Sequence, residues 1–235
     1  RSTLFPYTTL FRSPYRSSAP PTFGPDRVWS YSFGEKWSSS DRRMLVNATA
    51  FYIKWSDAQT LHVLQCGYSF FENAAKLTSK GVELETQFRF TPEFVFAVNA
   101  AYTDATTNLA ISTIDARAGD RVPFFPEWTA TAAAEYSLPV RAGDIAFSAE
   151  YSYRSSMGTD FNPTLPIFRT IPSSSVVNAA VNFTTGPWQL GIFCTNLTDR
   201  EQISQVDSAD TPAQPGDGLY VGRPRTIGLR LQRGF

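Results

Sequence analysis

The residues with the clearest chemical potential in this sequence are two glutamates, Glu83 and Glu85, within the run 82–90. Glycoside hydrolases use two such carboxyl groups as acid and as base or nucleophile. Residues two apart on a strand share a face, with about 7 Å between their Cα atoms. Gln87 and Arg89 continue the same polar row, however, so we interpret all four residues as the lining of a water-filled lumen.

The histidine and the cysteines do not form a metal or redox motif. His62 is the only histidine, and Cys66 and Cys194 lie far apart without a CxxC pattern. A structural zinc site needs four closely spaced Cys or His ligands. We therefore interpret His62 as an exposed strand or loop residue and the cysteines as small, half-buried residues. The sequence predicts no metal site and no cofactor.

Two polar segments are further candidates for ligand contacts. The segment 199–218 carries aspartates that are not spaced as in an EF-hand, so we expect a solvated loop there; these are Asp207, Asp210 and Asp217. The segment 157–172 offers Phe161, Phe168 and Arg169. No nucleophile elbow, P-loop or dinucleotide-binding motif occurs, and we expect no enzymatic activity. The 21 basic and 21 acidic residues balance, which gives no indication of a nucleic-acid partner.

Strands with two unlike faces must position these residues. In the run 82–90, apolar residues and Thr86 alternate with the polar row, and similar alternation recurs along most of the chain. A strand with one apolar and one polar face fits lipid outside and water inside a transmembrane barrel. Aromatic residues, 14% of the chain, cluster near the ends of these runs and suit interfacial belts: Trp29, Tyr31, Tyr52, Trp55, Trp128, Tyr151, Tyr153, Trp188 and Tyr220.

The pattern predicts about nine antiparallel strands joined by alternating short and long links. The short links fall at 39–41, 91–93, 139–143 and 185–187, and the long ones at 65–72, 106–123, 157–172 and 199–218. Short periplasmic turns and longer external loops are typical of outer-membrane barrels, which close with an even number of strands. Nine is odd, so we expect an incomplete barrel. The predicted strands are 27–38, 42–64, 73–90, 93–106, 124–138, 144–156, 173–184, 187–198 and 219–235.

The first residues do not read as natural protein. Residues 3–13 resemble the translation of a common short-read sequencing adapter, codon by codon. We therefore expect 1–13 to be an artefact, 14–24 to be a loop remnant, and 25–235 to be the barrel portion.

Several segments resemble the closing strands of TonB-dependent outer-membrane receptors, in the order that this family has them. The resemblance spans about residues 25–235 and implies the last nine or so strands of a 22-stranded barrel with an N-terminal plug. The segments are Pro25–Lys36, Asn47–Trp55, Asn73–Lys76, Ser79–Glu85, Tyr151–Ser155, Asn196–Asp199 and Tyr220–Leu229.

The resemblance also implies function, partners and location. Such receptors take up scarce nutrients across the outer membrane of Gram-negative bacteria, with ferric siderophores as the leading substrate class. The implied partners are the TonB complex acting through the plug, the barrel-assembly machinery and outer-membrane lipid. In this family, a terminal aromatic residue after alternating apolar residues is the barrel-insertion signal, and Phe235, Leu231, Leu229 and Ile227 match it. Arg233 departs from that pattern.

Two alternatives remain open from the sequence. One is a different outer-membrane barrel, either a passive porin-like channel or a barrel enzyme. The other is a soluble β-sandwich that binds a ligand.

Overall fold

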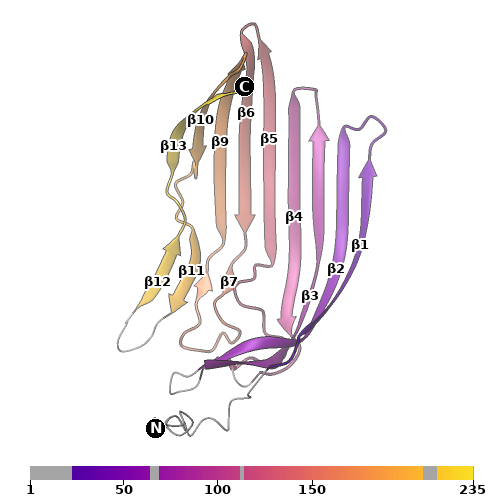
Figure 1. Cartoon of the computed structure of the whole chain (residues 1–235), viewed down its shortest axis with the longest axis vertical. Helices are drawn as coiled ribbons and strands as arrows, with labels where there is room; N and C mark the ends of the chain where they lie inside the picture. The colour runs from indigo at the N-terminus through magenta and orange to yellow at the C-terminus, as the bar shows by residue number, and fades with distance from the viewer. Residues whose placement is uncertain (1–22, 64–68, 112–113, 209–215, 235) are drawn as a thin grey trace, which may run out of the picture.

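A computed structural model describes residues 23–63, 69–111, 114–208 and 216–234. Figure 1 shows these residues as strands, turns and loops. No helix in the described part of the chain is long and apolar enough to cross a membrane. The strands are β1 (Arg27–Ser38), β2 (Met44–Val63), β3 (Ser69–Arg89), β4 (Phe94–Thr107), β5 (Trp128–Val140), β6 (Gly143–Arg154), β7 (Met157–Gly158), β8 (Thr170–Ile171), β9 (Ser174–Thr185), β10 (Trp188–Thr195), β11 (Ile203–Ser208), β12 (Asp217–Val221) and β13 (Thr226–Arg233).

Nine of these strands form one antiparallel sheet in the order β1-β2-β3-β4-β5-β6-β9-β10-β13. Each strand pairs with the next along the sheet, and within the described residues β1 and β13 each pair on one side only. The sheet is therefore open, and the predicted nine-stranded all-β barrel portion is confirmed. In Figure 1 the short turns lie at the upper end of the sheet and the long loops at the lower end. We call these the turn end and the loop end.

Three details differ from the expected strands. The predicted last strand, 219–235, is two strands: β12 pairs with β11 in a separate hairpin, and β13 completes the large sheet. Pro224 between them has no N–H to donate to a strand. The predicted loop 199–218 therefore contains β11, and 157–172 contains the small β7–β8 pair. The long link expected at 65–72 is wrong in length, because β3 begins at Ser69 rather than at residue 73.

The two faces of the sheet differ in polarity, as the alternation predicts. On one face, large apolar side chains are left exposed: Phe33 by 80%, Val82 by 53% and Leu229 by 81%. The polar row of β3 lies on the opposite face. No second sheet covers the apolar face among the described residues. A soluble sandwich buries such a face between two sheets, whereas the lipid-facing side of a transmembrane barrel leaves it exposed, so the observed exposure favours the barrel.

Aromatic side chains border the apolar face at both ends. At the turn end, successive ring centroids lie 5.6–6.5 Å apart in a belt of Phe88, Phe90, Phe94, Tyr136 and Phe147. At the loop end, Tyr102 and Trp128 lie 4.9 Å apart. Tyr102 follows Phe94 by eight positions on β4, a distance of about 27 Å along the strand. A tilt of about 40° reduces this to about 21 Å, close to the apolar height of about 25 Å of an outer-membrane barrel.

Two aromatics do not join these belts. Trp55 lies on the polar side of β2, where its indole N–H donates to the carboxylate of Asp26 over 2.7 Å. Tyr220 lies on β12, outside the large sheet. The expectation that both are belt residues is therefore wrong.

A small apolar core lies at the loop end. It consists of Ala58 and Ala75 from the β2–β3 hairpin and Ile111 and Ala116 from the β4–β5 loop, with Phe161 packed against it. The hairpin reaches this core because its register shifts after Trp55, at the left-handed residue Asp57 (φ 58°). In Figure 1 the loop-end part of the hairpin turns across the lower end of the sheet.

Asn73 holds this bend in place. Its amide donates to the carbonyl of Asp57 over 2.7 Å and to the carbonyl of Gly24 over 3.0 Å. Its carbonyl oxygen accepts the Gly24 N–H over 2.6 Å. One side chain thus ties the chain before β1 to both strands of the hairpin.

The turn between β1 and β2 is closed by a side chain. The Ser39 hydroxyl donates to Asp41 over 2.6 Å, and the Arg43 N–H donates to the same carboxylate over 3.2 Å. These hydrogen bonds stabilise the ionised carboxylate and lower the pKa of Asp41 from 3.8.

Gly81 is a position in the sheet that we expect to tolerate no side chain. A Cβ there would collide with the carbonyl oxygen of Tyr102 and lie 2.7 Å from the ring of Phe51. We expect Gly81→Ala to lower the free energy of unfolding by about 2 kcal/mol, measured by guanidinium denaturation of the full-length protein in lipid vesicles. Gly218→Ala is the control, because its Cβ would make ordinary contacts at 3.7 Å with Asp207. Equal effects of the two substitutions would contradict this explanation.

Candidate functional site

The predicted polar row lies together on one face of β3. Glu83, Glu85, Gln87 and Arg89 are all exposed there. Asn47 of β2 lies opposite Glu85 and donates to its carboxylate over 3.2 Å. Asn99, Thr131 and Ser152 continue the row across β4, β5 and β6. The two glutamates are thus part of a continuous polar surface rather than an isolated catalytic pair.

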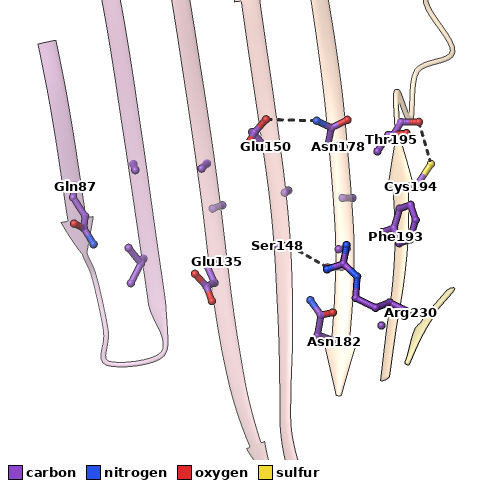
Figure 2. A pocket seen from close by; sticks show the side chains of 18 residues that line it. Gln87, Glu135, Ser148, Glu150, Asn178, Asn182, Phe193, Cys194, Thr195 and Arg230 are labelled. Carbon is purple, nitrogen blue, oxygen red and sulfur yellow. Dashed lines mark hydrogen bonds between the residues drawn. The ribbon is translucent and has the colours of Figure 1, made fainter. Parts of the chain in front are cut away.

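The same face forms a hollow of about 690 Å³ nearer the turn end. Figure 2 shows its labelled polar side chains, which come from β3, β5, β6, β9, β10 and β13. The amide of Asn178 donates to Glu150 over 3.5 Å. Carboxylates, amides and one guanidinium can bind water, polar solutes or polypeptide, and no apolar core fills this space. The labelled polar residues are Gln87, Glu135, Ser148, Glu150, Asn178, Asn182, Thr195 and Arg230.

Arg230 is held in the hollow by an aromatic ring. Its guanidinium carbon lies 5.7 Å from the centroid of the Phe193 ring, within the range of a cation–π contact. Phe193 also lies against Gly228, where a Cβ would meet the ring. The glycine therefore lets the ring lie flat on the sheet beneath the arginine.

A second pocket, of about 230 Å³, lies among the loops. It is formed by the β4–β5 loop and the loop between β6 and β9, and it combines aromatic with charged residues: Asp120, Arg121, Phe125, Asp160, Phe161 and Phe168. Arg121 forms an ion pair with Glu127. Of the sequence-predicted contacts, Phe161 and Phe168 are brought together here. Arg169 is engaged elsewhere, since it donates to Asp217 over 2.6 Å and to the Pro166 carbonyl over 2.6 Å.

Asn162 fixes the two loops around this pocket relative to each other. Its side chain is 2% exposed. The amide nitrogen donates to Asp115 of the β4–β5 loop over 2.9 Å, and the amide oxygen accepts from the Thr164 N–H over 2.9 Å and its hydroxyl over 2.7 Å. Its role follows from contacts between distant segments, which the sequence alone does not reveal.

Two segments that carry the family resemblance, Asn196–Asp199 and Gly222–Arg225, bind each other. The Asn196 amide donates to the Arg200 carbonyl over 2.9 Å and to the Arg223 carbonyl over 3.2 Å, and it accepts the Arg200 N–H over 3.1 Å. Asp199 accepts the Arg225 N–H over 2.9 Å and lies 3.4 Å from its guanidinium. These contacts hold the chain between β12 and β13 out of the sheet.

Asp207 and Asp217, the two candidate aspartates of the segment 199–218 that the structure describes, do not meet around a cation. Asp217 pairs with Arg169, and Asp207 accepts from the Gln205 amide over 2.7 Å. Asp207 also raises the pKa of Tyr220 above 10.0, since its carboxylate accepts the phenol's hydrogen bond and repels the phenolate. Asp210 lies outside the described residues.

The remaining candidates are His62 and the two cysteines. The backbone of His62 pairs with Phe70 in the β2–β3 hairpin. Cys194 is a half-buried free thiol on β10, and Cys66 lies outside the described residues. Within the described part of the chain, no group of three metal-ligating side chains is found.

The last strand places its apolar residues on the apolar face of the sheet. Ile227, Leu229 and Leu231 are 71%, 81% and 64% exposed on the apolar face of β13. Phe235 lies outside the described residues. Arg233, which departs from the family pattern, lies over the ring of Trp188 on β10, 5.4 Å from its centroid. The aromatic side chain at this edge thus comes from the neighbouring strand.

Comparison with known proteins gives one family and a set of similar structures. A family model described as "TonB dependent receptor-like, beta-barrel" matches residues 4–197. The structure is similar to the ferric yersiniabactin uptake receptor FyuA from Yersinia pestis, with a TM-score of 0.73 and 19% identity over 89% of this chain. It is also similar to the ferric citrate transporter FecA, with a TM-score of 0.70 and 19% identity over 89% of this chain.

A third similar structure is BauA, the ferric preacinetobactin receptor from Acinetobacter baumannii. Its TM-score is 0.68, with 18% identity over 92% of this chain. The chain spans only 30–31% of the length of these three structures. At such identity the structures show a shared fold, and the family match covers most of the chain.

Proposed function

The chain belongs to the TonB-dependent receptor β-barrel family, and we propose that it forms part of the barrel wall of a receptor that imports a ferric siderophore. The family consists of outer-membrane receptors and transporters of Gram-negative bacteria, not enzymes. We place this protein in that membrane, with the apolar face of the sheet toward lipid and the polar face toward the lumen.

The observation that carries this proposal is the single sheet with two unlike faces. The exposed apolar face, bordered by two aromatic belts about 21 Å apart, needs a bilayer to cover it. The polar row of β3 and the hollow around Arg230 then line an aqueous lumen. A passive porin would share these faces, but the family match favours an energised receptor.

The substrate class and partners are parts of the same proposal. The similar structures are named as receptors or transporters for ferric yersiniabactin, ferric citrate and ferric preacinetobactin. The loop pocket lined by Phe161, Phe168 and Arg121 offers aromatic and charged contacts at the external end. Transport would be driven by the TonB complex acting on a plug region, which the described residues do not include.

Membrane insertion would rest on the last strand. In this proposal, the barrel-assembly machinery reads Phe235 together with Leu231, Leu229 and Ile227. The exposed apolar row on β13 supports this role, because Ile227, Leu229 and Leu231 alternate on one face of the strand.

Uptake of labelled iron by cells that carry the full-length gene tests the substrate class. We expect deletion of the gene to abolish uptake of at least one ⁵⁵Fe-siderophore from a chemically diverse panel, and the complementing gene to restore it only when TonB is present. Uptake of cobalamin or a saccharide instead would show a receptor with another substrate. TonB-independent uptake would contradict the energised mechanism.

A substitution in the loop pocket tests the binding site. We expect Phe168→Ala to weaken the apparent affinity for the imported siderophore by roughly three- to tenfold, because one aromatic contact contributes about 0.5–1.5 kcal/mol. Leu109→Ala is the matched control, since Leu109 is 44% exposed on the same loops and does not line the pocket. Surface abundance is measured in parallel. An unchanged affinity at normal abundance would exclude Phe168 from the site.

A further inference from the structure

We propose that the loop-end border of the apolar face, at Arg27, Lys54 and Lys80, binds the phosphate groups of a glycolipid in the outer leaflet of the membrane. The proposal rests on the membrane placement proposed above. It is independent of which nutrient the receptor imports.

The three cations form a diagonal row on the face that carries the apolar residues. Lys54 lies directly opposite Trp29 of β1, and Lys80 lies opposite Tyr52 of β2. Arg27 and Lys54 are diagonal neighbours across β1 and β2, as are Lys54 and Lys80 across β2 and β3. Diagonal neighbours lie about 7–8 Å apart, so their long side chains can converge on one phosphorylated headgroup.

The row carries excess positive charge. Within the described part of the chain, its carboxylate partner is Asp104, which lies opposite Lys80 at 3.5 Å from the ammonium, while the Lys80 side chain stays 61% exposed. Among the described residues, no carboxylate pairs with Arg27 or Lys54. The nearby Asp26 accepts the indole N–H of Trp55 instead. Two exposed cations are therefore left without an acidic partner on this side of the sheet.

The position of the row relative to the aromatic belt matches the level of lipid headgroups. Trp29, Tyr31 and Tyr52 adjoin the cations on the same face, and aromatic rings of this kind lie at the membrane interface. Lysine and arginine extend from such positions so that the charge reaches the headgroups. At the turn end, by contrast, Arg43 lies 3.6 Å from Asp41, and Arg233 lies over Trp188.

An apolar crevice beside the cations fits the other half of a lipid. It has a volume of about 450 Å³ and is lined on β1 to β5 by Phe33, Ala50, Val82, Leu84, Tyr102 and Trp128. Val82 is the next residue after Lys80 on this face, so a lipid with its phosphate on the lysines would lay an acyl chain over the crevice. Glu35, also in the crevice, would repel a phosphate there, which favours the headgroup at the lysine end.

Binding of purified lipids to the full-length receptor in detergent tests the proposal by native mass spectrometry. The probes are a bisphosphorylated lipid A and its dephosphorylated form, without siderophore. A juxtamembrane cation contributes about 1 kcal/mol to the binding of an anionic surface, which is about a fivefold change in affinity. We expect Arg27→Gln and Lys54→Gln each to weaken binding of the bisphosphorylated lipid about fivefold, because each removes one cation.

The control is Lys36→Gln, an exposed lysine on the polar face of β1 opposite Asn47. It should leave lipid binding unchanged, and the dephosphorylated lipid should bind all variants equally. Competition by millimolar inorganic phosphate alone would indicate a free-phosphate site and overturn the lipid assignment. So would equal binding of the two lipids, or an equal loss in the Lys36 variant. A receptor that binds the lipid but imports no siderophore would overturn only the substrate proposal.

Discussion

Replacing Leu229 by Arg should destabilise the full-length receptor in lipid by about 2–4 kcal/mol, because it places a charge near the middle of the apolar band. Leu229 lies opposite Ile192, four residues along β10 from the turn-end aromatic Trp188. At a tilt of about 40° this is roughly 10 Å from the aromatic belt, near the midplane of a band about 25 Å high. Guanidinium unfolding in phospholipid vesicles measures the loss, and heat-modifiable gel migration reports the folded fraction.

The matched control is Gln232→Arg on the opposite face of the same strand. Gln232 pairs with Gln189 on the polar face, next to the natural Arg230. Because an arginine there would stay in water, we expect a change below about 1 kcal/mol. Equal effects of the two substitutions would contradict the assignment of the lipid face. A Gln232 variant less stable than the Leu229 variant would reverse it.

Replacing Asn196 by Ala should destabilise the loop end by about 3 kcal/mol. Asn196 is 3% exposed, and its amide serves two carbonyls and one N–H from Arg200 and Arg223. Removing it leaves these buried groups unpaired, at about 1–3 kcal/mol each before any relaxation. Its left-handed backbone (φ 51°) also favours Asn over Ala. Hydrogen exchange should therefore accelerate at β11, β12 and the segment that joins β12 to β13.

Two further variants separate the causes. Asn196→Gly removes the amide but tolerates the left-handed backbone, so its effect isolates the lost hydrogen bonds. Asn99→Ala is the control for an asparagine on the exposed polar face, where the amide donates weakly to Thr131 over 3.4 Å, and it should change stability by less than about 0.5 kcal/mol. Exchange confined to residues near position 196, with β11 and β12 unaffected, would show that Asn196 does not hold that hairpin.

The strands were the part of the fold that the sequence could predict, because a strand with one apolar and one polar face has apolar and polar residues at alternate positions. The run 82–90 shows this clearly, and the structure places its polar row on one face. The same logic located all nine strands of the large sheet to within a few residues at most ends. It required no knowledge of contacts between distant segments, because neighbouring strands pair in chain order.

The loops could not be predicted in this way, because their structure depends on residues far apart in the sequence. The bend of the β2–β3 hairpin depends on Asn73 reaching Gly24, and the end of β12 depends on Asn196 reaching Arg223. The sequence predicts one strand over 219–235, although the alternation is clear only from Thr226 to Gln232, and hydrogen bonds to Asn196 and Asp199 divide that span in two. The sequence predicted two residues of the loop pocket, Phe161 and Phe168, but not Arg121.

The apolar core at the loop end joins three segments that would otherwise be separate loops. Ala58 and Ala75 come from one segment, Ile111 and Ala116 from a second, and Phe161 from a third. Phe161 also lines the loop pocket, so a ligand that displaces its ring must disturb the packing of all three. The outer surface should therefore respond to ligand as one cooperative unit, in which occupancy of a single small pocket shifts the equilibrium position of a hairpin that never touches the ligand.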